Sequence, residues 1–174
     1  MLFAQDLPRV VIETEMGTIE AEIEVQRAPV TAANFLKYVD AKLYDGGRFH
    51  RTVKPDNQPN NTVKIEVIQA GRRENTQGFP PIPLERTSVT GVTHENGVLS
   101  MARNGPDTAS SDFFITVGAQ HELDFAGTRN PDGQGFAAFG RVVSGMDVVR
   151  KIQGAPVEAQ RLTPPVRIRT IHRK

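Results

Sequence analysis

The 174-residue sequence contains no cysteine and no tryptophan, and 21 Lys and Arg against 20 Asp and Glu leave a net charge of only +1. The absence of cysteine excludes disulfides, thiol nucleophiles and thiolate-bound metals, and it is compatible with reducing and oxidising compartments alike. The small net charge lacks the basic excess of a typical nucleic-acid-binding protein. No apolar run approaches the roughly 20 residues that cross a bilayer. We therefore expect neither nucleic acid nor a membrane as a partner.

The first five residues, Met1–Gln5, lack the basic and apolar regions of a complete signal peptide. They are compatible with the remainder of a trimmed signal peptide and with an ordinary disordered start. Together with the absence of cysteine, this slightly favours a periplasmic or secreted protein over a cytoplasmic one. The length is typical of one domain. We expect a flexible segment over residues 1–9 and a single domain over residues 10–174, and nothing in the sequence requires more than a monomer.

Short strand-like segments dominate the chain. In one of them Ile19, Ala21 and Ile23 alternate with glutamates, which is the two-residue period of a half-buried strand. Eight segments of this kind are predicted: Val10–Met16, Thr18–Val25, Arg48–Lys54, Val63–Ala70, Gly97–Ala102, Asp112–Val117, Phe136–Val143 and Pro165–Ile171. Helical spacing of apolar residues predicts two helices, Pro29–Leu43 and Gly145–Gln153. The pattern favours a mainly β protein, a closed eight-stranded antiparallel barrel capped by two helices, with a β-sandwich as the alternative.

Motifs for nucleotides, metals and covalent catalysis are missing. The four histidines have no paired spacing with carboxylates that would suggest zinc, and no GxxxxGKS/T or GxGxxG run is present. Ser110-Ser111-Asp112 lies outside any GxSxG context, and the loop Asn130–Gly135 lacks the glutamate that completes a calcium loop. We therefore expect no metal, no cofactor and no hydrolytic nucleophile.

Three groups of motifs follow one another along the chain: Phe49-His50-Arg51 with Val67-Ile68-Gln69-Ala70-Gly71, Gly97-Val98-Leu99-Ser100-Met101-Ala102 with Ser111-Asp112-Phe113-Phe114-Ile115, and Glu122-Leu123-Asp124 with Phe139-Gly140-Arg141-Val142-Val143. In this order they resemble the cyclophilin family of peptidyl-prolyl cis–trans isomerases, in particular its single-domain bacterial members. The resemblance extends from about Val10 to the C-terminus. It implies an eight-stranded barrel capped by two helices and a shallow groove that binds proline-containing peptides and unfolded protein segments without a cofactor.

The resemblance also implies roles for individual residues. Arg51 matches the catalytic arginine of the family. The positions that match the peptide-binding residues are Phe49, His50, Val67, Gln69, Ala102, Arg103, Asp112, Phe114, Leu123 and Phe136. Three of these, Val67, Phe114 and Leu123, match the walls of the pocket that receives the proline ring.

The chemistry of prolyl isomerisation suits an arginine. The barrier of roughly 20 kcal/mol arises from the partial double-bond character of the C–N bond, and twisting that bond returns the lone pair to the prolyl nitrogen. A donor aimed at this nitrogen binds the twisted state better than either planar state, which is what catalysis requires. Arg51 stays protonated and presents a rigid fork of donors.

The sequence departs from the family pattern at several points. The polar segment Pro55–Thr62 lengthens the connection after Arg51, and we expect it to be a mobile surface loop beside the groove that tunes substrate choice. Arg103 replaces the more usual asparagine, and Glu122 occupies a position that is often aromatic. These differences leave an alternative function open, a cyclophilin-fold peptide-binding module or chaperone with little turnover.

Overall fold

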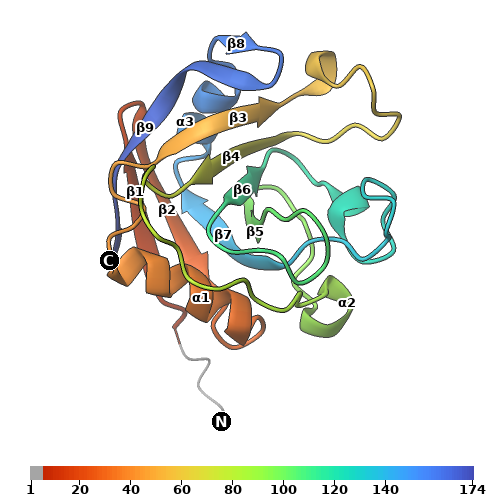
Figure 1. The fold of residues 1–174 in the computed structure, drawn as a ribbon, viewed down its shortest axis with the longest axis horizontal. Coiled ribbons are helices and arrows are strands. Elements are labelled where there is room, and N and C mark those ends of the chain that lie inside the picture. The colour runs from red at the N-terminus through yellow and green to blue at the C-terminus, as the bar shows by residue number, and fades with distance from the viewer. Residues whose placement is uncertain (1–5) are drawn as a thin grey trace.

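A computed structural model describes residues 6–174 (Figure 1). Its strands are β1 (Arg9–Thr14), β2 (Gly17–Ile23), β3 (Arg48–Val53), β4 (Val67–Gly71), β5 (Val98–Met101), β6 (Phe113–Thr116), β7 (Ala138–Ser144), β8 (Val157–Glu158) and β9 (Arg161–Arg173). The helices are α1 (Pro29–Asp40), α2 (Thr87–Thr90) and α3 (Met146–Gln153), and two 3₁₀ turns are η1 (Pro55–Asn57) and η2 (His121–Leu123).

The strands form one antiparallel sheet in the order β1-β2-β7-β5-β6-β4-β3-β9, and a further pairing of β1 with β9 closes it. The predicted eight-stranded barrel is therefore confirmed, and the β-sandwich is excluded. The two-residue strand β8 pairs only with β9 and adds a ninth strand outside the ring. Closure leaves no open edge among the eight barrel strands, so none of them offers a free row of backbone donors and acceptors.

The long helices lie at opposite ends of the barrel, with α1 at the lower edge of Figure 1 and α3 near its upper edge. The face of α1 that is directed at the barrel contributes Phe35, whose ring centroid lies 5.4 Å from that of Phe113 and 4.9 Å from that of Phe139. The apolar residues of α3, Val149 and Ile152, are fully buried in the same core. Burying each such side chain contributes roughly 1.5–3 kcal/mol, so both helices are held by their apolar stripes.

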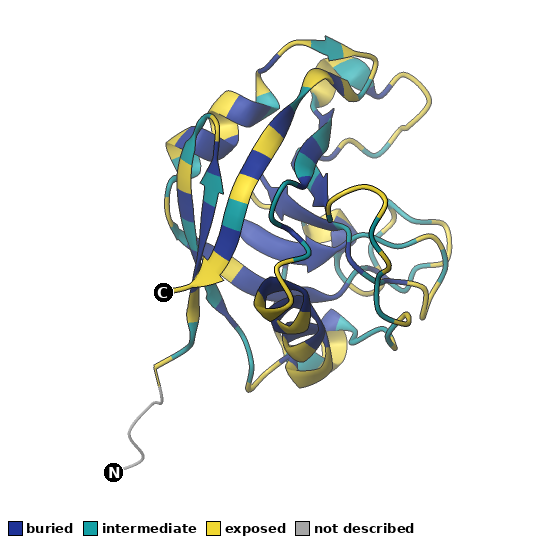
Figure 2. Cartoon of the chain, turned by 60° about the vertical axis from the view of Figure 1, so that its left-hand side comes forward, coloured by how far each residue is buried: buried dark blue, intermediate teal, exposed yellow. Residues whose placement is uncertain are grey.

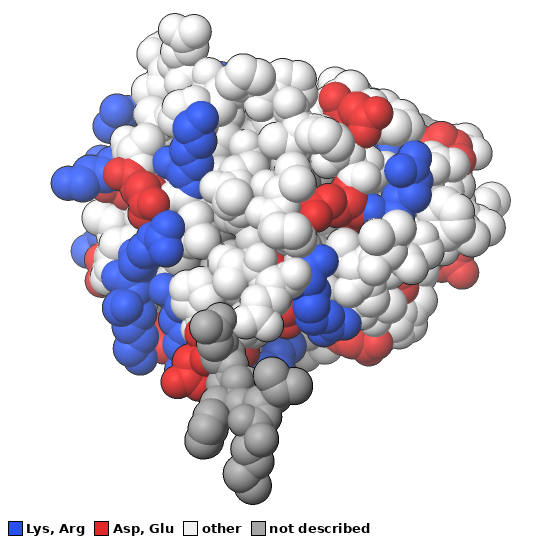
Figure 3. Space-filling view, turned by 90° about the horizontal axis from the view of Figure 1, so that it is seen from below, with Lys and Arg blue, Asp and Glu red and all other residues white. Residues whose placement is uncertain are grey.

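Burial alternates along most of β9. Val166 and Ile168 are buried whereas Arg167 and Arg169 are exposed, and Figure 2 shows this alternation along the strand that leads to the C-terminus. An irregularity in the pairing with β1 then shifts the period, so that Ile171 is buried in place of Thr170. On the face in Figure 3, basic and acidic side chains lie close together rather than in patches of one sign. None of the helices among residues 6–174 is long and apolar enough to cross a membrane.

Two of the element boundaries that differ from the prediction have a clear local cause. The helix predicted over Pro29–Leu43 ends at Asp40, because Lys42 adopts a left-handed conformation with φ 57° that stops helical hydrogen bonding. The strand predicted over Val63–Ala70 begins only at Val67. The reason is that the side chain of Gln58 binds both the backbone N–H and the carbonyl of Ile65, which removes Ile65 from strand pairing.

Other elements were missed or shortened by the sequence patterns. The last strand is longer than the predicted Pro165–Ile171, and α2, β8 and the two 3₁₀ turns had no periodic signal because they are only two to four residues long. The expected N-terminal segment of residues 1–9 overlaps β1 at Arg9, and its first five residues lie outside the described part of the chain.

Candidate active site

A second, smaller apolar cluster lies apart from the barrel core. It consists of Val53, Ile65, Val67, Phe114 and Leu123, with Ala102 and Phe136 packed against it. The alternation of β6 explains this division, because Phe113 points into the barrel core and its neighbour Phe114 points to the opposite side. All of these residues except Val53 line an open hollow of about 270 Å³, and the rest of its lining is polar. A hollow with apolar walls of this kind suits a small ring such as that of proline.

Arg51 lines the same hollow from β3, next to an irregularity in the pairing of that strand between Phe49 and Arg51. Its Nη1 donates to Oε1 of Gln69 at 2.9 Å, and its Nε and Nη2 both donate to Oε1 of Gln160 at 3.0 and 2.8 Å. Each terminal nitrogen therefore retains an N–H for a ligand. Burial lowers the pKa of Arg51, but a guanidinium stays protonated at neutral pH.

A series of hydrogen-bonded side chains orients the guanidinium of Arg51. Gln69 accepts from Arg51 and places its own amide nitrogen 3.4 Å from Oδ2 of Asp112, and Nε2 of His50 lies 3.2 Å from the same oxygen. Within residues 6–174, no carboxylate lies within 4.0 Å of the Arg51 nitrogens. The positive charge of Arg51 is therefore held by neutral amides and remains available to a bound molecule.

A second hollow of about 220 Å³ adjoins the first, and the two share Gln69, Ala102, Arg103 and Asn104. Together they form a continuous groove that could accommodate an extended peptide rather than a single ring. The predicted positions Gln69, Ala102, Arg103 and Asp112 line the second hollow.

Most of the predicted site residues therefore meet at the groove, but two do not. Phe49 is fully buried in the barrel core, with its ring centroid 6.2 Å from that of Phe113, so it supports the site from behind and cannot touch a peptide. His50 lines a neighbouring cleft of about 620 Å³ with Arg51 and Asp112, not the apolar hollow. The side chain of Arg103 is only 1% exposed and is paired with Asp132, so it fixes the loop 130–135.

Two contributors to the site carried no signal in the sequence. Gln160, from the turn between β8 and β9, accepts two of the hydrogen bonds of Arg51. Arg129 lines the apolar hollow from the loop after η2 and donates to Oε1 of Gln58 and to the carbonyl of Val63, both at 2.7 Å. Both residues come from segments that the sequence patterns identify only as turns.

The polar segment 55–62, which was expected to be a mobile surface loop, is anchored to this site by one buried side chain. Gln58 is only 1% exposed. Its amide donates to the carbonyls of Lys54 and Ile65, and its Oε1 accepts from Ile65 N–H and Arg129. The segment therefore contributes to the fold of the groove wall.

We expect the substitution Gln58→Ala to destabilise the protein by about 2–3 kcal/mol, because several buried backbone and guanidinium groups lose their partner at once. Urea unfolding monitored by circular dichroism measures this loss. Asn60→Ala, an exposed change in the same segment, is the matched control. Equal stability of the two variants would show that the segment is the freely mobile loop that its composition suggests.

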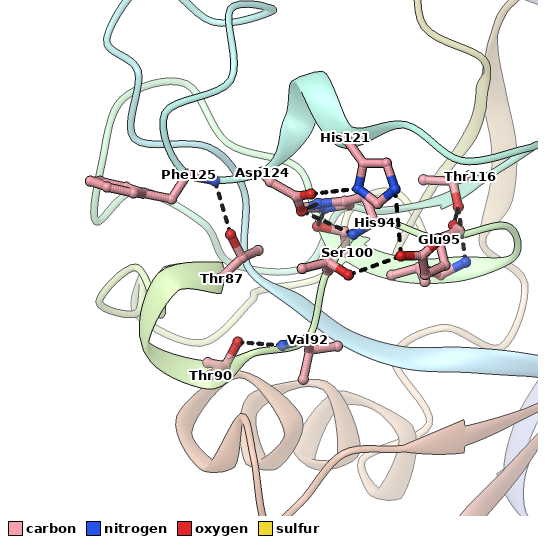
Figure 4. A network of polar contacts seen from close by, with 12 residues as sticks. Thr87, Thr90, Val92, His94, Glu95, Ser100, Thr116, His121, Asp124 and Phe125 are labelled. Atoms are coloured by element: carbon pink, nitrogen blue, oxygen red, sulfur yellow. Dashed lines mark hydrogen bonds and ion pairs between the residues drawn. The ribbon is translucent and has the colours of Figure 1, made fainter.

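His94 and Asp124 are the centre of a network of polar contacts with Ser100 and His121 (Figure 4). His94 is fully buried, and its ring stacks on that of Phe114, a wall of the hollow, at 6.0 Å and 13°. Its Nδ1 lies 2.7 Å from Oδ1 of Asp124, and its Nε2 lies 2.8 Å from Oγ of Ser100. Because a carboxylate only accepts, Nδ1 carries the proton. Ser100 is itself fully buried, so this Ser–His–Asp arrangement has no accessible nucleophile and serves to hold Phe114 and its surroundings.

Asp124 is shared between two histidines. Burial alone raises the pKa of its carboxyl, but hydrogen bonds from His94 and His121 outweigh burial and hold that pKa below its ordinary value. On the other side, the bond to Asp124 raises the pKa of the exposed His121.

These shifts predict how stability depends on pH. A lowered carboxyl pKa contributes stability above the unfolded value of about 3.9, and that contribution is lost as the pH falls through the folded pKa. The raised pKa of His121 contributes below about 6.5 and is lost as the pH rises through its folded value, with a small effect because the side chain is exposed. We expect Asp124→Asn to lose less stability than the wild type between pH 5 and pH 2.5 in urea titrations, because the contribution of this one carboxyl group is removed. An unchanged pH profile in this variant would contradict the assignment.

The model of the cyclophilin type peptidyl-prolyl cis-trans isomerase family matches residues 9–173. The chain belongs to this family. This cyclophilin is 34% identical over 146 residues to a peptidyl-prolyl cis-trans isomerase of Acinetobacter baylyi. The aligned part covers 83% of this chain and 71% of that protein. It is also 34% identical over 159 residues to the isomerase cyp18 of Streptomyces antibioticus, with 86% of each chain covered.

A solved structure of a cyclophilin-type isomerase from Cryptosporidium parvum has the same fold, with a TM-score of 0.78, 21% identity and coverage of 97% of this chain and 98% of that chain. A second structure of that protein, determined in the presence of the dipeptide Ala-Pro, has a TM-score of 0.75 and covers 94% of this chain and 97% of that one. The 174-residue cyclophilin is thus an enzyme of the peptidyl-prolyl cis–trans isomerase class, as its motifs predicted.

Proposed function

We propose that this cyclophilin accelerates rotation about X–Pro bonds in unfolded or partly folded proteins and so assists protein folding. The observation that carries the proposal is the position of Arg51, a charged donor without a carboxylate partner, beside an apolar hollow of proline size. Proline-containing peptides are the expected substrates, in line with the Ala-Pro dipeptide present with the related Cryptosporidium parvum protein.

In the proposed mechanism, the proline ring occupies the hollow between Phe114, Leu123 and Val67. The chain before the proline lies along the adjoining hollow, next to the backbone of Ala102 and Arg103. As the C–N bond twists, its lone pair returns to the prolyl nitrogen and accepts an N–H of Arg51. The apolar side chains around the proline ring displace part of the water from this hydrogen bond and so strengthen it. No nucleophile, base or covalent intermediate is required.

A direct test is NMR exchange spectroscopy on a blocked proline tetrapeptide with the wild-type protein. We expect the exchange rate between the cis and trans forms to rise in proportion to enzyme concentration. Saturable peptide binding without faster exchange would instead support the alternative function, a cyclophilin-fold binding module or chaperone with little turnover.

Glu122 leads to a prediction about inhibition. Cyclosporin-sensitive cyclophilins generally present a tryptophan N–H at the matching position, whereas the Glu122 carboxylate only accepts hydrogen bonds and is bound to the N–H and hydroxyl of Thr128. A missing donor and a charge placed against an apolar macrocycle cost roughly 1–3 kcal/mol, or one to two decades of affinity. We expect weak inhibition by cyclosporin, which Glu122→Trp should strengthen most, and which Glu122→Gln should strengthen less because it removes the charge and adds an amide donor without the indole ring. Stoichiometric inhibition of the wild type in an activity titration would contradict this.

A further inference from the structure

Arg129 occupies a position in the groove that the proposed mechanism does not use. Only its Nη1 is bonded, to Gln58 and to the carbonyl of Val63, and these two contacts fix the guanidinium at the wall of the apolar hollow. Its Nε and Nη2 make no hydrogen bond to the described residues. Three of its five N–H donors are therefore available on the side that is not held by the segment 58–63.

The hollow carries an uncompensated positive charge. Three arginines line it, and of these only Arg103 has a carboxylate partner, Asp132 at 2.9 Å. Neither Arg51 nor Arg129 has a carboxylate oxygen within 4.0 Å in residues 6–174. Two acids precede Arg129 closely in the sequence, and both have other partners. Asp124 binds His94 and His121, and Glu122 binds Thr128.

The guanidinium groups of Arg51 and Arg129, which both lack a carboxylate partner among the described residues, also act on each other. Burial lowers the pKa of Arg129, and the positive charge of Arg51 lowers it further. Two like charges in a partly desolvated hollow repel each other, and a bound anion would relieve that repulsion. A planar guanidinium with free donors matches a carboxylate better than any neutral group.

We infer that Arg129 determines specificity by selecting peptides in which an acidic side chain directly follows the proline. This inference rests on the proposed function. With the proline ring in the apolar hollow and the preceding chain along the second hollow, the following residue leaves the groove on the remaining side. Arg129 lines the proline hollow and not the second one. Because Arg51 is assigned to the prolyl nitrogen, Arg129 is the remaining arginine without a carboxylate partner in this hollow, and we assign it to the residue that follows the proline.

The test uses two blocked peptides, Ala-Ala-Pro-Glu-Ala and Ala-Ala-Pro-Gln-Ala, which differ only in the charge after the proline. We expect the wild type to isomerise the Glu peptide with a kcat/KM about three- to tenfold higher than that for the Gln peptide, mainly through a lower KM. The ratio should shrink towards one as salt is raised, because the charges are partly exposed. The variant Arg129→Gln should bring it close to one, and Arg129→Lys should retain part of it.

The Gln peptide reports any general damage, since loosening of the segment 58–63 would slow both peptides equally and leave their ratio unchanged. Arg150→Gln, the same change of charge on the exposed surface of α3, should leave the ratio at its wild-type value. A wild-type ratio near one with normal turnover of the Gln peptide would overturn the inference and leave the proposed function intact. Failure to isomerise either peptide would overturn both.

Discussion

Replacing Arg51 with alanine should lower kcat/KM for a proline tetrapeptide by two to three orders of magnitude, while the dissociation constant of the peptide rises only a few-fold. A preorganised donor that acts on the transition state contributes about 3–4 kcal/mol in comparable sites. The donor acts mainly on the twisted state, so its loss should appear in kcat rather than in KM. NMR exchange spectroscopy measures turnover, and a fluorescence titration measures binding.

Two control variants separate the role of Arg51 from structural damage. Arg51→Lys keeps the charge but cannot form the fork that Gln69 and Gln160 hold, so we expect partial activity. Gln160→Ala leaves the guanidinium in place but removes two of its hydrogen bonds, and a smaller decrease in kcat is expected. Turnover by Arg51→Ala equal to that of a folded wild-type control would disprove the mechanism.

The proposed site combines residues that the sequence can predict with residues that it cannot. Phe113 and Phe114 are an example of the first kind, because strand alternation requires that one faces the core and the other faces away. The observed barrel core and separate cluster follow this rule. The strands were predictable for the same reason, since their two-residue period is a local property of the chain.

The residues that hold Arg51 and the groove wall in place could not be predicted from the sequence. Gln160 is 109 positions from Arg51, and Arg129 is 71 positions from Gln58. A single glutamine or arginine in a turn has no periodic context, so its partner is determined only when the barrel closes. The burial of Gln58 could not be predicted either, because polar turn-forming residues ordinarily remain solvated. The side chain is buried here only because each of its polar atoms has a partner.

The buried network behind Phe114 leads to the second large effect. His94→Ala should destabilise the protein by about 3 kcal/mol, which corresponds to a decrease of roughly 6–12 °C in Tm for a chain of this size. The substitution opens a cavity against the Phe114 ring and removes hydrogen bonds to Asp124 and Ser100 at a side chain that is fully buried. Thermal unfolding by differential scanning calorimetry measures the change.

His121→Ala is the matched control, because it removes the same type of side chain from the same carboxylate. The difference is burial: the side chain of His94 is 0% exposed, whereas that of His121 is 55% exposed. An exposed ion pair contributes roughly 0–1 kcal/mol, so His121→Ala should shift Tm by no more than about 4 °C. Since the lost ring also supports Phe114, His94→Ala should raise KM for a proline peptide at temperatures where the variant remains folded. Equal shifts in Tm for the two variants would show that the imidazole of His94, with its two hydrogen bonds and its stacking on Phe114, contributes no more to stability than a surface histidine.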